Sequence, residues 1–219
     1  MNYVIVDFEM NAIANQYKEE RAICTMEIIE IGAVILDEQF LVMGEFKTLV
    51  KPQYNDTISK KYETLTGIST QMVCDSPTFA TAYEMFAKWC EMYGKDYEVY
   101  AWSDSDFNQL VAEMKLKKYD KEELKLPLNR WHDFQKEYTE TLGLERALSL
   151  ENALYYAGVN PVGRMHDALY DAKNTAELFA IVRDAVRREE VLKVVMDAFR
   201  PKELKNSLGD LFDFGALLA

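Results

Sequence analysis

Four carboxylates stand where they could share metal ions. Asp7 and Glu9 follow the short apolar run at residues 3–6, and a strand would direct both side chains to one face. Asp106 follows a second apolar run, and Asp171 opens a long helical segment. Like charges held close together are unfavourable without a cation, and carboxylate oxygens suit Mg²⁺ or Mn²⁺. The set predicts two such ions, the arrangement that stabilises the attacking and leaving oxygens in phosphodiester hydrolysis.

A histidine near these acids supplies the remaining chemistry. His166 lies five residues before Asp171, and an imidazole that titrates near neutral pH can deprotonate an attacking water. Spacing alone leaves other readings open, because a lone acid at a strand end is usually a solvated turn residue. Asp104 also competes with Asp106 for the metal role, although the apolar helix face that begins at Phe107 follows Asp106 directly.

Strands and helices of an α/β fold must position these side chains. Short β-branched or apolar runs predict strands, whereas residues 10–26 lack clear periodicity and predict a loop. Strands that cluster early and then interleave with helices imply an α/β sandwich with a mixed sheet. The predicted strands cover residues 3–6, 28–36, 45–50, 97–102 and a short segment near 130–134.

Apolar residues at spacings of three and four predict the helices. These cover residues 59–65, 77–93, a helix capped by Ser103 or Asp104, and then 144–157 and 167–190. A further helix runs to about Phe199, where Arg200-Pro201 breaks it. We therefore expect one domain over residues 1–185 and a helical C-terminal extension and tail over 186–219. Residues 203–219 alternate acids with large apolar groups and would dock on the body, self-associate or bind a protein partner.

Composition restricts the class of protein and its partners. With 49% hydrophobic residues the chain can bury a core, and the first ten residues lack the basic region of a signal peptide. No run approaches the roughly 20 apolar residues of a membrane span. Cys24, Cys74 and Cys90 are far apart and form no CxxC pair, so we expect reduced, buried thiols in a cytoplasmic protein. The net charge of −12 disfavours binding of long duplexes, but not attack on a strand end.

Three motifs in order resemble those of the DEDDh (DnaQ-like) 3′–5′ exonuclease superfamily. They are Val-Asp7-Phe-Glu9-Met, Trp102-Ser-Asp-Ser-Asp106 and His166-Asp-Ala-Leu-Tyr-Asp171, and the resemblance runs from residue 3 to about 182. It implies a ribonuclease H-like fold, a mixed five-stranded sheet flanked by helices. It also implies that the four acids hold the metals, that His166 is the general base, and that nucleoside 5′-monophosphates are released from a 3′ end.

Further segments resemble one branch of that superfamily, the histone-mRNA-end and small-RNA exoribonucleases. They are Trp131-His-Asp133 and the helix at Leu148–Leu154, and they favour RNA over DNA as the single-stranded partner. Met10 and Phe107 match positions that contact the terminal base or sugar, with core packing an equal contender for Phe107. Leu65 and Thr66 match a segment that shapes the nucleotide pocket, although a helix stop would also explain Thr66-Gly67.

Several alternatives remain open at this level. The substrate could instead be DNA or a very short oligonucleotide, which the acidic composition mildly favours. The chain could be a non-catalytic interaction module that acts through the tail around Leu211–Phe214, although a scaffold has no reason to keep a complete metal set. Glu30 lies inside an apolar strand and would either support the metal ligands or face solvent. The lysines at 115–121 would form either a solvated face or a nucleic-acid path.

Overall fold

A mixed sheet of five strands forms the centre of the computed structural model, which describes residues 1–119 and 128–199. The strand order is β3-β2-β1-β4-β5, with β3–β2–β1 antiparallel and β1–β4–β5 parallel. This confirms the predicted mixed five-stranded sheet. The predicted role of residues 203–219 lies outside the described residues. The strands are β1 Asn2–Ala12, β2 Met26–Leu36, β3 Val42–Leu49, β4 Tyr97–Ala101 and β5 Trp131–Asp133.

Strand β1 is longer than its apolar run predicted. It continues through Asp7 and Glu9 to Ala12, because its antiparallel pairing with β2 extends to the Ala12–Met26 pair, with an irregularity between Glu9 and Met10. Interstrand hydrogen bonds therefore stabilise an extended backbone that has no apolar run of its own. The predicted loop at 10–26 is wrong for its first residues, and the short helix α1 (Lys18–Arg21) lies inside it.

The helices follow the predicted order with three differences. The short helices α3 and α6 were not predicted, and the predicted helix at 144–157 begins only at Leu150. The predicted helix at 167–190 is divided at Asp184, whose extended backbone ends α8 and whose carboxylate accepts hydrogen bonds from Val186 N and Arg187 N at the start of α9. The helices are α2 Lys60–Thr66, α3 Thr70–Val73, α4 Phe79–Met92, α5 Asp104–Leu116, α6 Phe134–Thr141, α7 Leu150–Ala157, α8 Ala168–Arg183 and α9 Ala185–Phe199.

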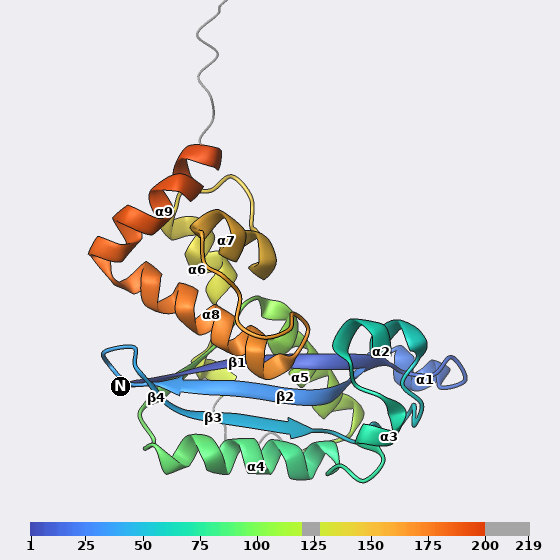
Figure 1. Ribbon diagram of the computed structural model, residues 1–219. Helices are drawn as coiled ribbons and strands as arrows, with labels where there is room; N and C mark the ends of the chain where they lie inside the picture. The colour runs from blue at the N-terminus through green and yellow to red at the C-terminus, as the bar shows by residue number, and fades with distance from the viewer. Residues whose placement is uncertain (120–127, 200–219) are drawn as a thin grey trace, which may run out of the picture.

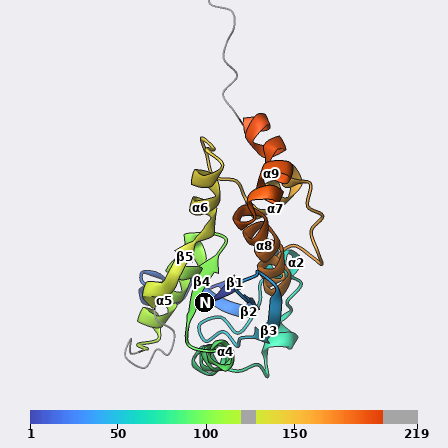
Figure 2. The same cartoon turned by 90° about the vertical axis from the view of Figure 1, so that its left-hand side faces the viewer.

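Alternation along β1 divides the core between the two faces of the sheet. Val4, Val6 and Phe8 pack into a cluster with residues of α4 and α5. Ile5 points the other way, into a cluster formed with α6, α7 and α8 that also includes Val195 of α9. Figure 1 shows α4 beneath the sheet and α8 across its upper face, with α6, α7 and α9 beyond, and Figure 2 shows the same layers from the side. The face that carries Asp7 and Glu9 is thus the face on which α8 lies.

Two of the three cysteines are buried as predicted. Cys24 and Cys90 lie in the core, but Cys74 is exposed, and that prediction was wrong because Cys74 follows the short surface helix α3, which buries only Val73. All three are free thiols. Within residues 1–119 and 128–199, no helix has both the length and the apolar character that crossing a membrane requires.

Candidate active site

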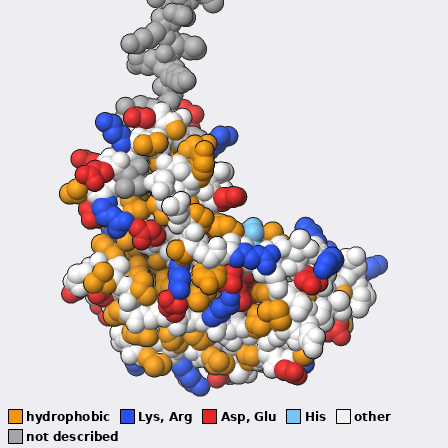
Figure 3. All heavy atoms as spheres, in the orientation of Figure 1, with side chains coloured by type: hydrophobic (Ala, Val, Ile, Leu, Met, Phe, Trp, Pro, Cys, Tyr) orange, Lys and Arg blue, Asp and Glu red, His pale blue; other side chains and the backbone are white. Residues whose placement is uncertain are grey.

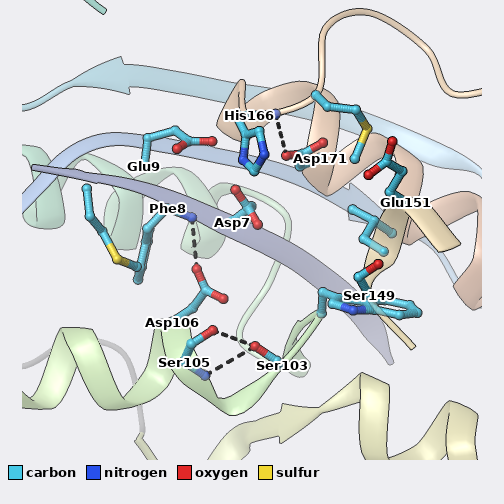
Figure 4. Close-up of a pocket in the computed structure, with 14 residues that line it drawn as sticks. Asp7, Phe8, Glu9, Ser103, Ser105, Asp106, Ser149, Glu151, His166 and Asp171 are labelled. Atoms are coloured by element: carbon cyan, nitrogen blue, oxygen red, sulfur yellow. Dashed lines mark hydrogen bonds between the residues drawn. The ribbon is translucent and has the colours of Figure 1, made fainter. Parts of the chain in front are cut away.

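Five residues predicted to do chemistry meet in one pocket of about 390 Å³. Asp7 and Glu9 come from β1, Asp106 from the first turn of α5, Asp171 from the first turn of α8, and His166 from the segment before α8. Figure 4 shows the four carboxylates and the imidazole directed toward a common space between these elements. Segments up to 164 residues apart in the sequence thus supply one site.

Asp106 is positioned by the place where β4 ends. The parallel pairing of β1 with β4 stops at Ile5 and Tyr100, so β1 continues beyond its neighbour. There the Phe8 N–H donates to Asp106 Oδ1 at 3.0 Å in place of a strand partner. Asp106 is 5% exposed and lines the pocket, whereas Asp104 is exposed and does not. The geometry therefore separates the two candidate aspartates in favour of Asp106.

Asp171 is tied to the backbone of His166. His166 N–H donates to Asp171 Oδ2 at 2.9 Å, which closes the segment before α8 onto its first turn. His166 has a φ of +62°, a left-handed conformation that is uncommon for residues other than glycine and recurs at functional sites. The second oxygen of the same carboxylate, Asp171 Oδ1, is buried and has no hydrogen-bond partner. A buried acceptor of this kind calls for a partner, such as an ordered water or a bound ion.

Helix α8 reaches the site because Gly32 of β2 lets it approach. A Cβ at Gly32 would lie 2.1 Å from the Ala168 carbonyl carbon and the Leu169 nitrogen. Glu30, two residues earlier and 2% exposed, accepts a hydrogen bond from Ala168 N at 2.9 Å through Oε2. The reading in which Glu30 faces solvent is therefore wrong, and its support of metal ligands stays a prediction. Lys47 completes the contact, with its Nζ 3.2 Å from Glu30 Oε1 and 2.6 Å from Oδ2 of Asp167, the N-cap of α8.

The acids strongly disfavour being charged together. Burial, followed by the nearby carboxylates of Asp106 and Glu9, raises the pKa of Asp7 well above its usual range. Burial and the neighbouring acids raise the pKa of Glu9 to about 8, and burial raises that of Asp106 to about 7. Burial also raises the pKa of Asp171, against the opposing effect of the His166 N–H. A cation in the pocket would relieve this repulsion.

The donor atoms fit a hard metal ion. One ligand atom each from Glu9, His166 and Asp171 can be chosen so that all lie within 4.8 Å of one another. With Asp7 and Asp106 in the same pocket, the set is dominated by carboxylate oxygens, which Mg²⁺ and Mn²⁺ prefer. The unpartnered Asp171 Oδ1 supplies an acceptor that such an ion would satisfy.

The four residues predicted to touch the nucleotide occupy different positions. Met10 lines the pocket. Phe107 is half-buried, packs its ring 5.8 Å from that of Trp131 and does not line the pocket. Leu65 is exposed at the end of α2, while Thr66 is buried and its hydroxyl donates to Tyr62 O and accepts from Ile68 N. These bonds fit the helix-stop reading of Thr66, and the substrate contacts of all four residues stay predictions.

Eight residues line the pocket that had not been predicted to belong to it. Those from α7 and its N-cap could not be placed from local pattern, because the packing of α7 and α8 in one cluster brings them to the site. The likeness of the 148–154 segment to exoribonucleases was the signal that pointed to them. The eight are Phe8, Trp102, Ser103, Ser105, Ser149, Leu150, Glu151 and Met165.

Comparisons with known proteins agree with this arrangement. The nuclease domain of 3′hExo, described as a DEDDh family member bound to rAMP, matches with a TM-score of 0.72 at 24% identity, over 85% of this chain and 94% of that one. Exonuclease I, a more distant structure at 14% identity, matches with a TM-score of 0.61 over 90% of this chain and 42% of that one. These likenesses show that the fold is ribonuclease H-like.

Sequence comparison identifies the family. ERI1 exoribonuclease 2 of Xenopus laevis is 29% identical over 196 residues, 80% of this chain but only 27% of that protein. The 3′–5′ exonuclease Snipper of Drosophila melanogaster is 28% identical over 204 residues, covering 84% of this chain and 70% of that protein. The family model RNase_T, described as an exonuclease, matches residues 4–179. The chain therefore belongs to the exonuclease family that this model describes.

Proposed function

We propose that this chain is a metal-dependent 3′–5′ exonuclease that removes nucleoside 5′-monophosphates from single-stranded nucleic acid, with RNA favoured over DNA. Asp7, Glu9, Asp106 and Asp171 would hold two Mg²⁺ or Mn²⁺ ions. The observation that carries the proposal is the buried, unpartnered Oδ1 of Asp171 inside a pocket that contains three further carboxylates. In a purely structural cluster, that oxygen would have no hydrogen-bond donor or ion to bind. The repulsion among the four carboxylates would also have no cation to offset it.

The residues of the pocket would have different roles in hydrolysis. When bound, two divalent ions stabilise the attacking and leaving oxygens of the phosphodiester. His166, exposed beside the pocket, would accept a proton from the attacking water as general base. The bond from His166 N to Asp171 Oδ2 keeps the imidazole beside the acids. Met10, at the Glu9 side of the pocket, would contact the terminal nucleotide, with Phe107, Leu65 and Thr66 further out.

The preference for RNA rests on relatives. The matched proteins include one named an exoribonuclease and a solved nuclease domain bound to rAMP, while other matched structures hold DNA. The first experiment is therefore hydrolysis of a 5′-labelled single-stranded RNA and its DNA counterpart, with Mn²⁺ or with EDTA. We expect a ladder that shortens from the 3′ end, requires the metal and forms faster on RNA. A ladder that forms faster on DNA would show a preference for DNA and would not contradict the proposed mechanism.

Asp7→Ala tests whether the acids are catalytic. We expect it to abolish hydrolysis, because Asp7 lines the pocket among the other carboxylates and the change would remove a proposed metal ligand. The matched control is Asp104→Ala, which removes an exposed acid near Asp106 that does not line the pocket and should leave hydrolysis intact. Activity in Asp7→Ala equal to that of the control would refute the proposed site.

His166 could serve as base or as metal ligand, and two readouts separate these roles. As general base, its replacement by alanine should lower kcat by about 10²–10⁴-fold and leave Mn²⁺ affinity, measured by calorimetry, close to that of the wild type. A parallel loss of Mn²⁺ affinity would make His166 a ligand instead, as its place near Glu9 and Asp171 permits. Normal turnover in His166→Ala would exclude both roles.

We further propose that residues 1–185 form the catalytic domain and 186–219 an appended element. The break at Asp184 gives a physical boundary, although α9 still packs Val195 into the core beside α7 and α8. Residues 203–219 would then bind a second copy or a protein partner. Deleting them and measuring the molar mass in solution by light scattering tests self-association. A cytoplasmic location remains a prediction from the unpaired cysteines.

A further inference from the structure

A second groove continues from the active-site pocket. It has a volume of about 380 Å³ and lies between α7 and the segment that leads to His166. It shares Glu151 and Met165 with the pocket, so the two spaces adjoin at these residues. Its lining residues are Glu151, Leu154, Tyr155, Gly158, Val159, Asn160, Pro161 and Met165.

The wall of this groove is apolar and carries an exposed aromatic ring. Leu154 is buried beneath it, and Val159 and Pro161 form its far side. Tyr155 is 76% exposed, so a ligand in the groove could reach its ring. Its ring meets that of Tyr156 edge-on at 5.2 Å, which supports it from one side. A flat apolar ligand could stack on the ring and cover the apolar wall.

Charge decides which part of a nucleotide could lie there. Among the residues that the structure describes, no lysine or arginine lines the groove, and the one charged residue that does is the acid Glu151. A phosphate would be repelled, whereas a nucleobase offers a π-face for Tyr155 and polar edges for the Asn160 amide and the Glu151 carboxylate. Glu151 and Asn160 are both exposed, and neither side chain has a hydrogen-bond partner among the described residues.

The order of residues along the pocket gives the direction of the strand. Figure 4 shows Glu9 at one side, Ser149 and Glu151 at the other, and Asp7, His166 and Asp171 between them. The terminal nucleotide would lie on the Met10 side. The rest of the strand would then run along α7. Figure 3 shows a histidine side chain at the surface where the upper helical layer meets the sheet layer, and His166 is exposed, so a strand can enter from solvent.

We propose that this groove is a subsite for an unpaired nucleobase upstream of the scissile bond, held by stacking on Tyr155. The inference rests on the proposed exonuclease function and adds a reason for its preference for single strands. A base inside a duplex is stacked and paired on both sides and cannot lie flat on Tyr155. A 3′ end would therefore need several unpaired nucleotides to engage both the acids and the groove.

The test combines a protein change with a substrate change. The protein variants are Tyr155→Ala, Tyr155→Phe, which keeps the ring, and Met92→Ala, which removes an equally exposed apolar side chain (77%) from α4. The substrates are single-stranded RNAs of one length, with a full set of bases or with one abasic site at the second, third or fourth nucleotide from the 3′ end. Affinity is measured by fluorescence anisotropy in EDTA, and KM and kcat with Mn²⁺.

We expect Tyr155→Ala to weaken binding of intact RNA and raise KM by about 5- to 150-fold, the range for losing one base–aromatic stack. Tyr155→Phe and Met92→Ala should match the wild type. One abasic position should weaken wild-type binding by a similar factor, and that same position should have no further effect in Tyr155→Ala. Non-additivity of this kind identifies the base that meets the ring.

Other outcomes separate the subsite from the proposed function. Cleavage of RNA with equal affinity in wild type and Tyr155→Ala would refute the subsite alone. The subsite would also be refuted if the loss of affinity caused by Tyr155→Ala and the loss caused by each abasic position were additive. A wild type that binds RNA with the expected Tyr155 dependence but cleaves nothing would refute the exonuclease function and leave the base subsite standing.

Discussion

At the scale of single residues, the features that fit the site to a metal also oppose folding. The carboxylates of Asp7, Glu9, Asp106 and Asp171 are held together in a largely buried pocket, and each has a raised pKa. An acid whose pKa is higher in the folded than in the unfolded chain binds more protons when folded. Its contribution to stability is therefore full at low pH and is lost as the pH rises through the folded-state pKa.

The effect of Glu9 on the free energy of unfolding can be measured. Its ordinary pKa of 4.5 rises to about 8, so without metal the free energy of unfolding should fall as pH increases between these values. Glu9→Gln keeps the shape and removes the charge, so in EDTA at pH 8 we expect it to be more stable than the wild type by about 1–4 kcal/mol. Thermal unfolding in EDTA from pH 5 to pH 8 measures both effects.

Metal should reverse the comparison. Mn²⁺ added at pH 8 should raise the unfolding temperature of the wild type more than that of Glu9→Gln. The ion neutralises the repulsion among the carboxylates and should bind more tightly to the site that keeps the Glu9 carboxylate. Glu38→Gln, an exposed acid remote from the pocket, serves as control and should follow the wild type throughout. A Glu9→Gln profile with the wild-type slope in EDTA would contradict the view that Glu9 is under electrostatic stress.

At the scale of elements, the site depends on how closely α8 approaches β2. Gly32 removes the side chain that would collide with the helix backbone, and Glu30 accepts the Ala168 N–H from the same strand. Lys47 of β3 ties Glu30 to Asp167, the cap of α8. Three residues without catalytic chemistry thus fix the position of Asp171. The hydrogen bond from His166 N to the Asp171 carboxylate then holds His166 beside it.

Gly32→Ala should separate α8 from the sheet. Because the added Cβ meets backbone atoms, which cannot rotate away, we expect a destabilisation of about 1–3 kcal/mol. Hydrolysis should fall by about 100-fold, as a misplacement of roughly 1 Å can produce. The control is Gly44→Ala in β3, where the new Cβ would meet only the Tyr93 side chain, remote from the pocket. Folded Gly32→Ala with full activity would show that the close approach does not set the site.

At the scale of the whole molecule, a buried ion network joins parts distant from the catalytic acids. Lys117, the C-cap of α5, lies 3.0 Å from Glu27 of β2 and 2.7 Å from Glu113, and both acids are fully buried. Glu27 also accepts from the backbone of Gln53 and Tyr54, and Glu113 from that of Ile28. The network holds α5, which carries Asp106, to the centre of the sheet. Lys117, at least, belongs to a structural cluster and not to a nucleic-acid path.

Lys117→Met should therefore affect folding more than catalysis. Removing the lysine leaves two buried carboxylates without a counter-ion, a loss of about 3–5 kcal/mol. Urea unfolding at neutral pH measures it, with Lys115→Met, an exposed position on the same helix, as control. Activity per folded molecule should stay within a few-fold of the wild type. Equal unfolding midpoints in the two variants would show that the network contributes no net stability.

Local sequence determined most of the elements of this protein and indicated its candidate chemistry. The acids at positions 7, 9, 106 and 171 and the histidine at 166 could be proposed in advance from their places near apolar runs and a helix start, together with the resemblance of three motifs to the exonuclease superfamily, and the fold brings all five into one pocket. The five strands and the order of the longer helices followed from the same local periodicity.

Tertiary structure decided what depends on contacts between distant segments. The extension of β1 comes from its pairing with β2, the role of Glu30 comes from an amide 138 residues away, and the α7 wall of the pocket comes from packing on α8. The groove beside Tyr155 exists only because α7 and the segment before His166 lie side by side. Hydrogen bonds and burial between such segments have no local pattern in the sequence, so only the folded chain reveals them.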